Sequence, residues 1–184
     1  MNGGDGIAEI DVVTLLSQAC SPSLVAAINE PGIYAISLAP SSVLSGIKAG
    51  KEGLLYIGMT SATLDARSHF RHSHSGFSTF RRSLGALLKE ELGLTAIPRG
   101  AGASASNFRN YRFSDIGEQA LTGWMNRNLL MAQAAVAANV AELEMRLIAE
   151  LEPPLNLTGW SNPQRAALKT LRAKCADEAR RQRT

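Results

Sequence analysis

Two short segments with alternating side chains constrain the fold more than any other feature of this sequence. Residues 32–38 read Gly-Ile-Tyr-Ala-Ile-Ser-Leu, and residues 54–59 read Leu-Leu-Tyr-Ile-Gly-Met. A two-residue period rich in β-branched and aromatic side chains, bounded by Gly and Pro, is typical of β-strands. Two such strands joined by a loop form a hairpin, which can place Tyr34 and Tyr56 on one face of a small sheet.

A cationic side chain follows the second predicted strand. The sequence predicts a short helix that begins at Thr60 or Ser61, both suitable N-cap residues, and that carries Arg67 outward. Two phenols and a guanidinium would then lie at one rim of the sheet. Taken singly, a strand tyrosine is usually a core residue and a helix arginine is usually solvated. The combination, with a glycine beside each tyrosine, favours a functional site.

These segments resemble the GIY-YIG nuclease superfamily, whose name spells the tripeptides at 32–34 and 56–58. The resemblance covers about residues 31–156 and includes, in the family's order, Arg67, a histidine, Glu144 and Asn156. It implies an α/β (α+β) fold with a small, mainly antiparallel three-stranded sheet flanked by helices. It also implies a DNA endonuclease that hydrolyses phosphodiester bonds with one divalent cation, Mg²⁺ or Mn²⁺.

The resemblance assigns a role to each polar residue. Glu144 would hold the metal ion, and Arg67 would stabilise negative charge in the transition state. Tyr34 would be the general base and Tyr56 would position the phosphate or the water, although the two could exchange roles. A phenol with a pKa of about 10 needs a lowered pKa to act as a base at neutral pH. Asn156 would contact a phosphate or fix the local geometry.

The histidine of the predicted site is the least certain member. The family's histidine usually lies one turn after the arginine, where this chain has Arg71. The neighbouring His72 is therefore the preferred candidate and His69 the alternative. Together with His74 they are the 3 histidines of the chain. A zinc site is the weaker interpretation, because no Cys or acidic partner lies nearby and the spacing is not a helical i, i+4 pair.

Glu144 stands out independently of the resemblance. Residues 140–151 predict a helix, and its apolar stripe consists of Val140, Leu143, Leu147, Ile148 and Leu151. Glu144 falls within that stripe. An isolated carboxylate is costly to bury, so it must pair with a cation, bind a metal or lie in a cleft. Arg67 or Arg71 could be the partner if the role is structural.

The remaining elements are predicted from periodicity and capping residues. We expect two short helices over 11–20 and 23–30, a helix that begins at Ser78 and ends at Gly93, a third strand over 108–113, a helix over 118–130 and a short strand over 131–137. The Ser- and Gly-rich spacer over 39–53 could close over DNA or be mobile. The organisation follows as a helical leader (1–30), a nuclease-like domain (31–159) and a basic C-terminal helix (160–184).

Basic residues are segregated along the chain, whose net charge is +3. Lys and Arg outnumber acidic residues in 64–113 and 160–184, which flank the motif set and suit a phosphate backbone. The candidate DNA-binding residues are Arg71, Arg81, Arg82, Asn156, Arg165, Lys169 and Arg172. The alternative is ordinary solvated charge. In the C-terminal helix we expect a capping box from Ser161 to Gln164 and an apolar stripe that docks the helix on the domain.

The rest of the sequence narrows the class of protein. Cys20 and Cys175 match no metal or redox spacing, which favours free thiols in a reducing compartment. The acidic amino terminus is unlike a signal peptide, and no apolar run reaches membrane-spanning length, so we expect a cytoplasmic protein. The main rival to a nuclease is a non-catalytic nucleic-acid-binding module with the same fold. The presence of Glu144 and Arg67 favours the enzyme.

Overall fold

The computed structural model describes residues 12–67, 69–70, 74–102 and 104–182. The helices are α1 (Val12–Ser17), α2 (Thr79–Leu87), α3 (Ala105–Arg109), α4 (Asp115–Asn128), α5 (Val140–Leu151) and α6 (Arg165–Arg181). The strands are β1 (Gly32–Leu38), β2 (Leu54–Thr60), β3 (Ala96–Ile97), β4 (Arg112–Phe113) and β5 (Leu129–Ala135). Short 3₁₀ turns are η1 (Pro22–Leu24), η2 (Lys51–Gly53) and η3 (Ser75–Phe77).

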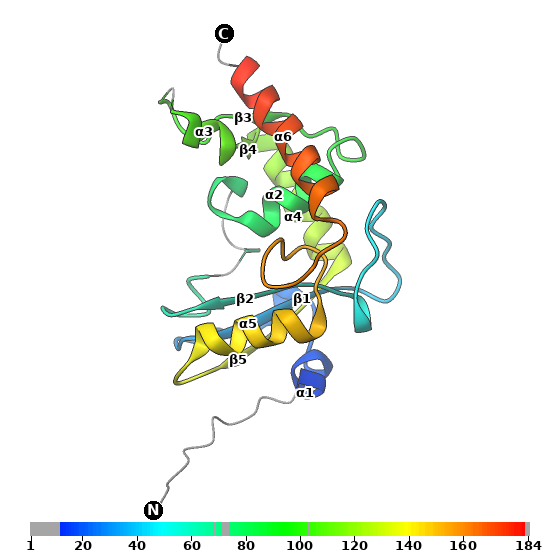
Figure 1. Ribbon diagram of the computed structural model, residues 1–184, viewed down its shortest axis with the longest axis vertical. Helices are drawn as coiled ribbons and strands as arrows, with labels where there is room; N and C mark the ends of the chain where they lie inside the picture. The colour runs from blue at the N-terminus through cyan, green and yellow to red at the C-terminus, as the bar shows by residue number, and fades with distance from the viewer. Residues whose placement is uncertain (1–11, 68, 71–73, 103, 183–184) are drawn as a thin grey trace, which may run out of the picture.

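A three-stranded antiparallel sheet lies at the centre of the fold. Its order is β2-β1-β5, so β1 is the central strand and pairs with both neighbours. Figure 1 shows α2, α4 and α6 on one side of this sheet and α1 and α5 on the other. The predicted α+β fold, with a small antiparallel sheet flanked by helices, is confirmed.

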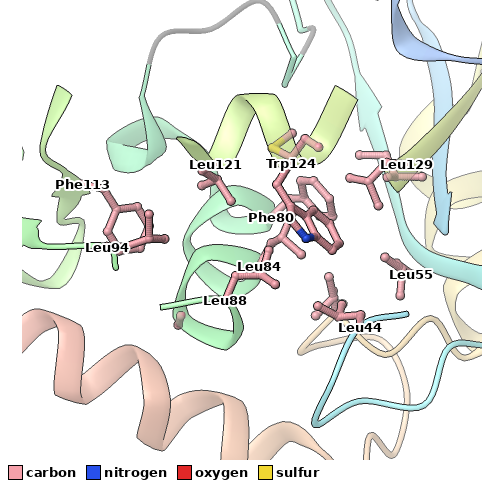
Figure 2. Close-up of a cluster of buried hydrophobic side chains, with 14 of the residues drawn as sticks. Leu44, Leu55, Phe80, Leu84, Leu88, Leu94, Phe113, Leu121, Trp124 and Leu129 are labelled. Carbon is pink, nitrogen blue, oxygen red and sulfur yellow. The ribbon is translucent and has the colours of Figure 1, made fainter. Parts of the chain in front are cut away.

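Each face of the sheet carries its own hydrophobic core because side chains alternate along β1. Tyr34 and Ile36 point into the larger core, where α2, α4 and α6 pack. Ile33 and Ala35 point into the smaller core beneath α1 and α5. Figure 2 shows the larger core, which joins Phe80 and Leu84 of α2, Leu121 and Trp124 of α4, and Leu44, Leu55 and Leu129. Buried Leu44 anchors the long spacer between β1 and β2.

The two strands that carry the tyrosines are confirmed, but the third strand is not where the sequence placed it. The segment predicted as a strand over 108–113 begins as α3, whose first turn is capped by the hydroxyl of Ser104. Only Arg112 and Phe113 remain extended, as β4, and they pair with β3 in a separate two-stranded ribbon. The third strand of the main sheet is β5, which begins at Leu129 rather than at 131.

Two short segments predicted as helices have other structures. Residues 23–30 hold only the 3₁₀ turn η1. The carbonyls of Ile28 and Glu30 accept hydrogen bonds from the backbone N–H groups of Asp65 and Leu64, so residues 28–30 pair with the segment after β2. That segment forms turns at 64–67 and not the regular helix predicted from Thr60. Thr63, whose hydroxyl accepts from the N–H of Ala66, caps it.

The C-terminal helix α6 is part of the domain's core. Leu168, Cys175 and Ala179 are buried in the larger cluster, as the predicted apolar stripe requires. The predicted capping box does not form, because the helix begins at Arg165 and the side-chain oxygen of Asn162 accepts from the N–H of Gln164 instead. Among the described helices none is both long and apolar enough to cross a membrane.

Candidate active site

Tyr34 forms the centre of the candidate site. Its ring is buried on the face of the sheet that α2, α4 and α6 cover, and its hydroxyl lies 2.7 Å from Nε2 of His69. Nδ1 of the same imidazole lies 2.8 Å from the hydroxyl of Ser78, the N-cap of α2. A continuous hydrogen-bonded path therefore joins the central strand to the start of α2.

The glycine of the second tripeptide makes room for this phenol. Tyr34 pairs with Gly58 across the β1–β2 ladder. A Cβ atom at Gly58 would lie 2.3 Å from the Tyr34 oxygen and 2.4 Å from Cζ, so no larger residue fits under the ring. The register also puts Tyr56 opposite Ile36, on the same face as Tyr34, with the two ring centroids 6.2 Å apart.

Aromatic rings surround His69 on several sides. Its ring centroid lies 5.1 Å from that of Tyr34, 6.1 Å from Tyr56 and 5.7 Å from Phe80. The imidazole is buried among these rings. His69 was the alternative to His72 in the sequence interpretation. His72 and Arg71 both lie outside the described residues, and the described geometry brings His69 to the tyrosine.

Arg67 is exposed at the end of the turn that follows β2. Its charge and a hydrogen bond to Tyr34 act to lower the pKa of that phenol. The same charge acts to lower the pKa of Tyr56 and of Glu144. The guanidinium is therefore close to all three groups while remaining open to a ligand from solvent.

Glu144 lies on α5, half-buried beside the edge strand β2. Its neighbours in the stripe, Leu143 and Leu147, are buried in the smaller core. Burial raises the pKa of Glu144, and a backbone hydrogen bond from Met59 and the charge of Arg67 only partly oppose that rise. Glu144, which the sequence placed within the apolar stripe, is thus half-buried among side chains of that stripe.

Asn156 holds the edge of β2 rather than facing a phosphate. Its side-chain oxygen accepts from the N–H of Ile57 at 2.9 Å, and its amide donates to the Ile57 carbonyl at 2.8 Å. The N–H of Leu155 donates to the carbonyl of Leu55. Residues 55, 57 and 59 thus use the outer edge of β2 to bind the segment after α5 and Glu144 itself. The sequence alternative of a structural role fits this buried side chain.

Burial also controls the protonation of the two tyrosines. Desolvation raises the pKa of Tyr34 above its ordinary value, and the charges of Tyr56 and Glu144 add to the rise. Desolvation raises the pKa of Tyr56 as well, with Glu144 as the next cause. Arg67 opposes both shifts without cancelling them. In the protein without a bound metal, both phenols are therefore neutral at physiological pH.

Arg81 and Arg82, predicted from the sequence as DNA-binding residues, are buried in the structure. Their side chains are 0% and 6% exposed. Arg81 forms a buried ion pair with Glu118 at 2.7 Å and donates to the carbonyl of His69 at 3.0 Å. Arg82 donates to the carbonyls of Ser75 and Gly76. Both guanidinium groups are used to hold the loop between Arg67 and α2.

Glu118 completes this buried network, and sequence reasoning missed it. One carboxylate oxygen accepts from the N–H groups of Ser75 and Phe113, and the other accepts from the Ser75 hydroxyl. Glu118 and Arg81 are far apart in the chain, so no local spacing marks them as partners. The network fixes the backbone of His69 and η3, and thereby positions the imidazole.

The basic residues predicted on α6 remain at the surface. Arg165 and Lys169 are exposed, and Arg172 is half-buried. Burial lowers the pKa of Arg82 to about 10, and the charge of Arg172 contributes to this shift. Arg172 therefore lies close to Arg82. These three positions are spaced along one flank of the helix, as the sequence indicated.

The oxygen donors of the site suit a hard divalent cation. Within the described residues, no three His, Cys, Asp or Glu side chains gather into a metal cluster. Mg²⁺ does not need one, because it keeps several waters and is commonly held by one or two carboxylates and by substrate phosphates. Glu144 is such a carboxylate, and its raised pKa shows that its negative charge is poorly compensated by the protein alone.

Comparison with known families agrees with this geometry. A family model described as the GIY-YIG catalytic domain matches residues 32–174. The matched range contains both tyrosine strands, Arg67, His69, α5 and the first part of α6. Neither a curated protein nor a solved structure gives a significant match.

Proposed function

The chain belongs to the GIY-YIG catalytic domain family, and from this membership and the site we propose that it is a metal-dependent DNA endonuclease. The observation that carries the proposal is the cluster of Tyr34, Tyr56, Arg67, His69 and Glu144 on and beside strands β1 and β2. This cluster combines a proton path, an exposed cation and a half-buried carboxylate, which phosphodiester hydrolysis requires.

Tyr34 and His69 act together as the base in this proposal. A water molecule attacks phosphorus and gives its proton to the Tyr34 oxygen, while the Tyr34 proton passes to Nε2 of His69, 2.7 Å away. This transfer uses the imidazole tautomer that carries its proton on Nδ1 and donates it to Ser78. The neutral phenol of the resting protein is then the correct starting state, so no tyrosinate has to form beforehand.

Arg67 and Tyr56 stabilise and orient the phosphate. The exposed guanidinium of Arg67 lies close to both phenols, where it opposes the negative charge that grows on the phosphate oxygens. Tyr56 is half-buried beside Tyr34 and positions the water or the phosphate. The bond between phosphorus and one sugar oxygen breaks as the water oxygen binds, and that sugar oxygen leaves as a hydroxyl group after it takes a proton from solvent.

Glu144 holds the divalent cation. A Mg²⁺ or Mn²⁺ ion at this carboxylate supplies Lewis-acid stabilisation of the negative charge on the phosphate and the leaving oxygen. Glu144 would hold the cation in its ionised form, and the positive charge of the cation would offset the burial that raises the pKa of this carboxyl in the protein alone.

The decisive experiment is incubation of the purified protein with supercoiled, branched and single-stranded DNA. We expect cleavage with Mg²⁺ or Mn²⁺ and none with EDTA. Binding without cleavage under every metal condition would support the rival function, a nucleic-acid-binding module with the same fold. Cleavage that persists in EDTA would contradict the metal-dependent mechanism.

A further inference from the structure

Phe77 is an exposed aromatic residue that lies next in the chain to Ser78, a member of the hydrogen-bonded path of the candidate active site. It is 70% exposed, although a phenylalanine ring is normally buried because of its large apolar area. It ends η3 and immediately precedes Ser78, whose hydroxyl contacts His69. The exposed ring is thus one residue from the hydrogen-bonded path that leads to Tyr34.

Two cationic or polar groups flank this ring. The guanidinium carbon of Arg99 lies 5.1 Å from the ring centroid, in cation–π geometry. The imidazole of His74 lies 5.1 Å from the ring, tilted by 43°. Gly76 permits this packing, because a Cβ atom there would lie 2.7 Å from the Arg99 side chain and 3.1 Å from Nδ1 of His74.

The backbone beneath Phe77 is unusually well fixed. Glu118 accepts from the N–H of Ser75 at 2.7 Å, and Arg82 donates to the carbonyls of Ser75 at 3.0 Å and Gly76 at 2.9 Å. Burying charged side chains costs free energy, so such groups stay buried only where their hydrogen bonds are well made. These hydrogen bonds hold the short turn rigidly, and the turn carries an apolar ring at its tip. A ring that is held rigidly in solvent loses little conformational entropy when a ligand stacks on it.

Positive charge surrounds the same turn. Arg99 and Arg172 both lie close enough to Arg82 to lower its pKa, in addition to the effect of burial. Arg99 and Arg172 are half-exposed, so their charges can reach a ligand. A polyanion with flat aromatic groups is a better match than a protein surface for an aromatic ring that has a guanidinium over it and further positive charge near the same turn.

We propose that Phe77, with Arg99 and His74, is a stacking platform for an unpaired DNA base next to the cleavage site. The proposal rests on the proposed nuclease function and specifies its substrate class. Bases in an intact duplex are stacked on each other, so the ring can stack only on a single-stranded, extruded or terminal base. The preferred substrate is therefore DNA with unpaired nucleotides, such as a branched or gapped duplex.

The test measures DNA binding in EDTA, so that it does not depend on cleavage. Fluorescence anisotropy compares a gapped duplex with a perfect duplex of the same length. Phe77→Ala should weaken binding to the gapped DNA about tenfold, the scale of losing one stacked base, and leave binding to the perfect duplex unchanged. Phe77→Trp should restore binding. Ile116→Ala, which removes an 81% exposed apolar side chain from α4, is the matched control.

Comparing the two DNAs distinguishes base stacking from other roles of Phe77. Equal loss on both DNAs would overturn base stacking and leave Phe77 as a general contact, and an unchanged affinity for gapped DNA would remove it from the interface. The fluorescence of 2-aminopurine placed opposite the gap should rise when the wild-type protein takes the base out of its stack with the neighbouring bases, and it should rise much less with Phe77→Ala. Cleavage of the same DNAs with Mg²⁺ reports separately on the nuclease function. Because Phe77 is exposed, thermal unfolding of the variant should match the wild type.

Discussion

At the scale of single residues, the protonation state of Tyr34 determines how the site can work. Burial keeps this phenol neutral, since it raises the pKa above the ordinary value of a tyrosine. A neutral phenol accepts a proton only if it gives up its own, and Nε2 of His69 is within hydrogen-bonding distance to take it. The sequence interpretation instead required a lowered tyrosine pKa, because a sequence alone does not show the contact between Tyr34 and His69.

The relay leads to a ranking of two conservative variants. Tyr34→Phe should abolish measurable cleavage, because it removes the oxygen that receives the water's proton. Tyr56→Phe should leave a slow residual rate, since it removes only a positioning contact. Single-turnover cleavage with saturating Mg²⁺ measures both. The reverse ranking would exchange the two roles, and two mild effects would point to a metal-bound hydroxide that acts without either phenol.

Glu144→Gln should leave a folded protein that binds DNA but cuts at least about a hundredfold more slowly, the scale of losing a main electrostatic contribution. Glu142→Gln, an exposed position on the same helix, is the control. The raised pKa of Glu144 sets the pH dependence. At subsaturating Mg²⁺, where protons compete with the cation for this carboxylate, cleavage should fall as the pH drops, and the fall should begin at a higher pH than for an ordinary glutamate. Metal-dependent cutting at an undiminished rate in the Gln variant would exclude Glu144 from the site.

Arg67→Ala separates transition-state stabilisation from binding. The exposed guanidinium lies beside both phenols, so its removal should lower the turnover of bound DNA much more than the affinity for DNA. Arg127→Ala, an exposed arginine near the end of α4, is the comparison. Filter binding in EDTA gives the affinity, and single-turnover kinetics give the rate. A collapse in affinity with unchanged turnover would make Arg67 a binding residue only.

At the scale of elements, the loop between β2 and α2 depends on one buried ion pair. Glu118→Gln would leave the fully buried Arg81 without its counter-charge, which typically costs about 3–5 kcal/mol of unfolding free energy. Asp115 lies on the same helix as Glu118 and forms a largely exposed ion pair with Arg112 of β4. Asp115→Asn breaks that pair and should lower the free energy of unfolding by less than about 1 kcal/mol. Urea denaturation of both variants measures the difference. Similar small losses would show that the buried pair does not hold this loop.

The elements that could be predicted from sequence are those with a local signal. The alternating tyrosine strands, the Ser78 cap and the stripe around Glu144 all have one, and each is present in the structure. The predicted start of β5 was two residues too late, because α4 ends at Asn128 and β5 begins at Leu129 with no Gly or Pro at the boundary. Periodicity alone could not mark that boundary.

Long-range pairing decides where several of the predicted site residues lie. Arg81 lies off the apolar stripe of α2 and looked solvated, but Glu118 from α4 covers it. Asn156 matched a motif position, yet its partner is the backbone of Ile57. Solvent exposure of a charged side chain depends on what packs over it, and a single sequence does not show that.

At the scale of the whole molecule, α6 connects the hydrophobic core to the basic surface. Its buried stripe packs with α2 in the larger core, so deleting residues 161–184 would remove core residues as well as charge. Its outer flank carries Arg165 and Lys169 in solvent and Arg172 beside Arg82 and Arg99. Charge reversal therefore tests the function of this helix better than truncation does.

Replacing Arg165, Lys169 and Arg172 together by Glu should weaken DNA binding and reduce its salt dependence. Each lost phosphate contact flattens the plot of log affinity against log salt by about 0.9 on duplex DNA, because fewer counterions are released. The control reverses Arg127 and Arg146, two exposed arginines on α4 and α5. Titrations in EDTA at several salt concentrations give the slopes.

Metal-dependent cutting at saturating DNA should survive the reversal, since none of the three residues contacts Tyr34 or Glu144 in the proposed site. An unchanged slope in a folded variant would leave α6 with a structural role only.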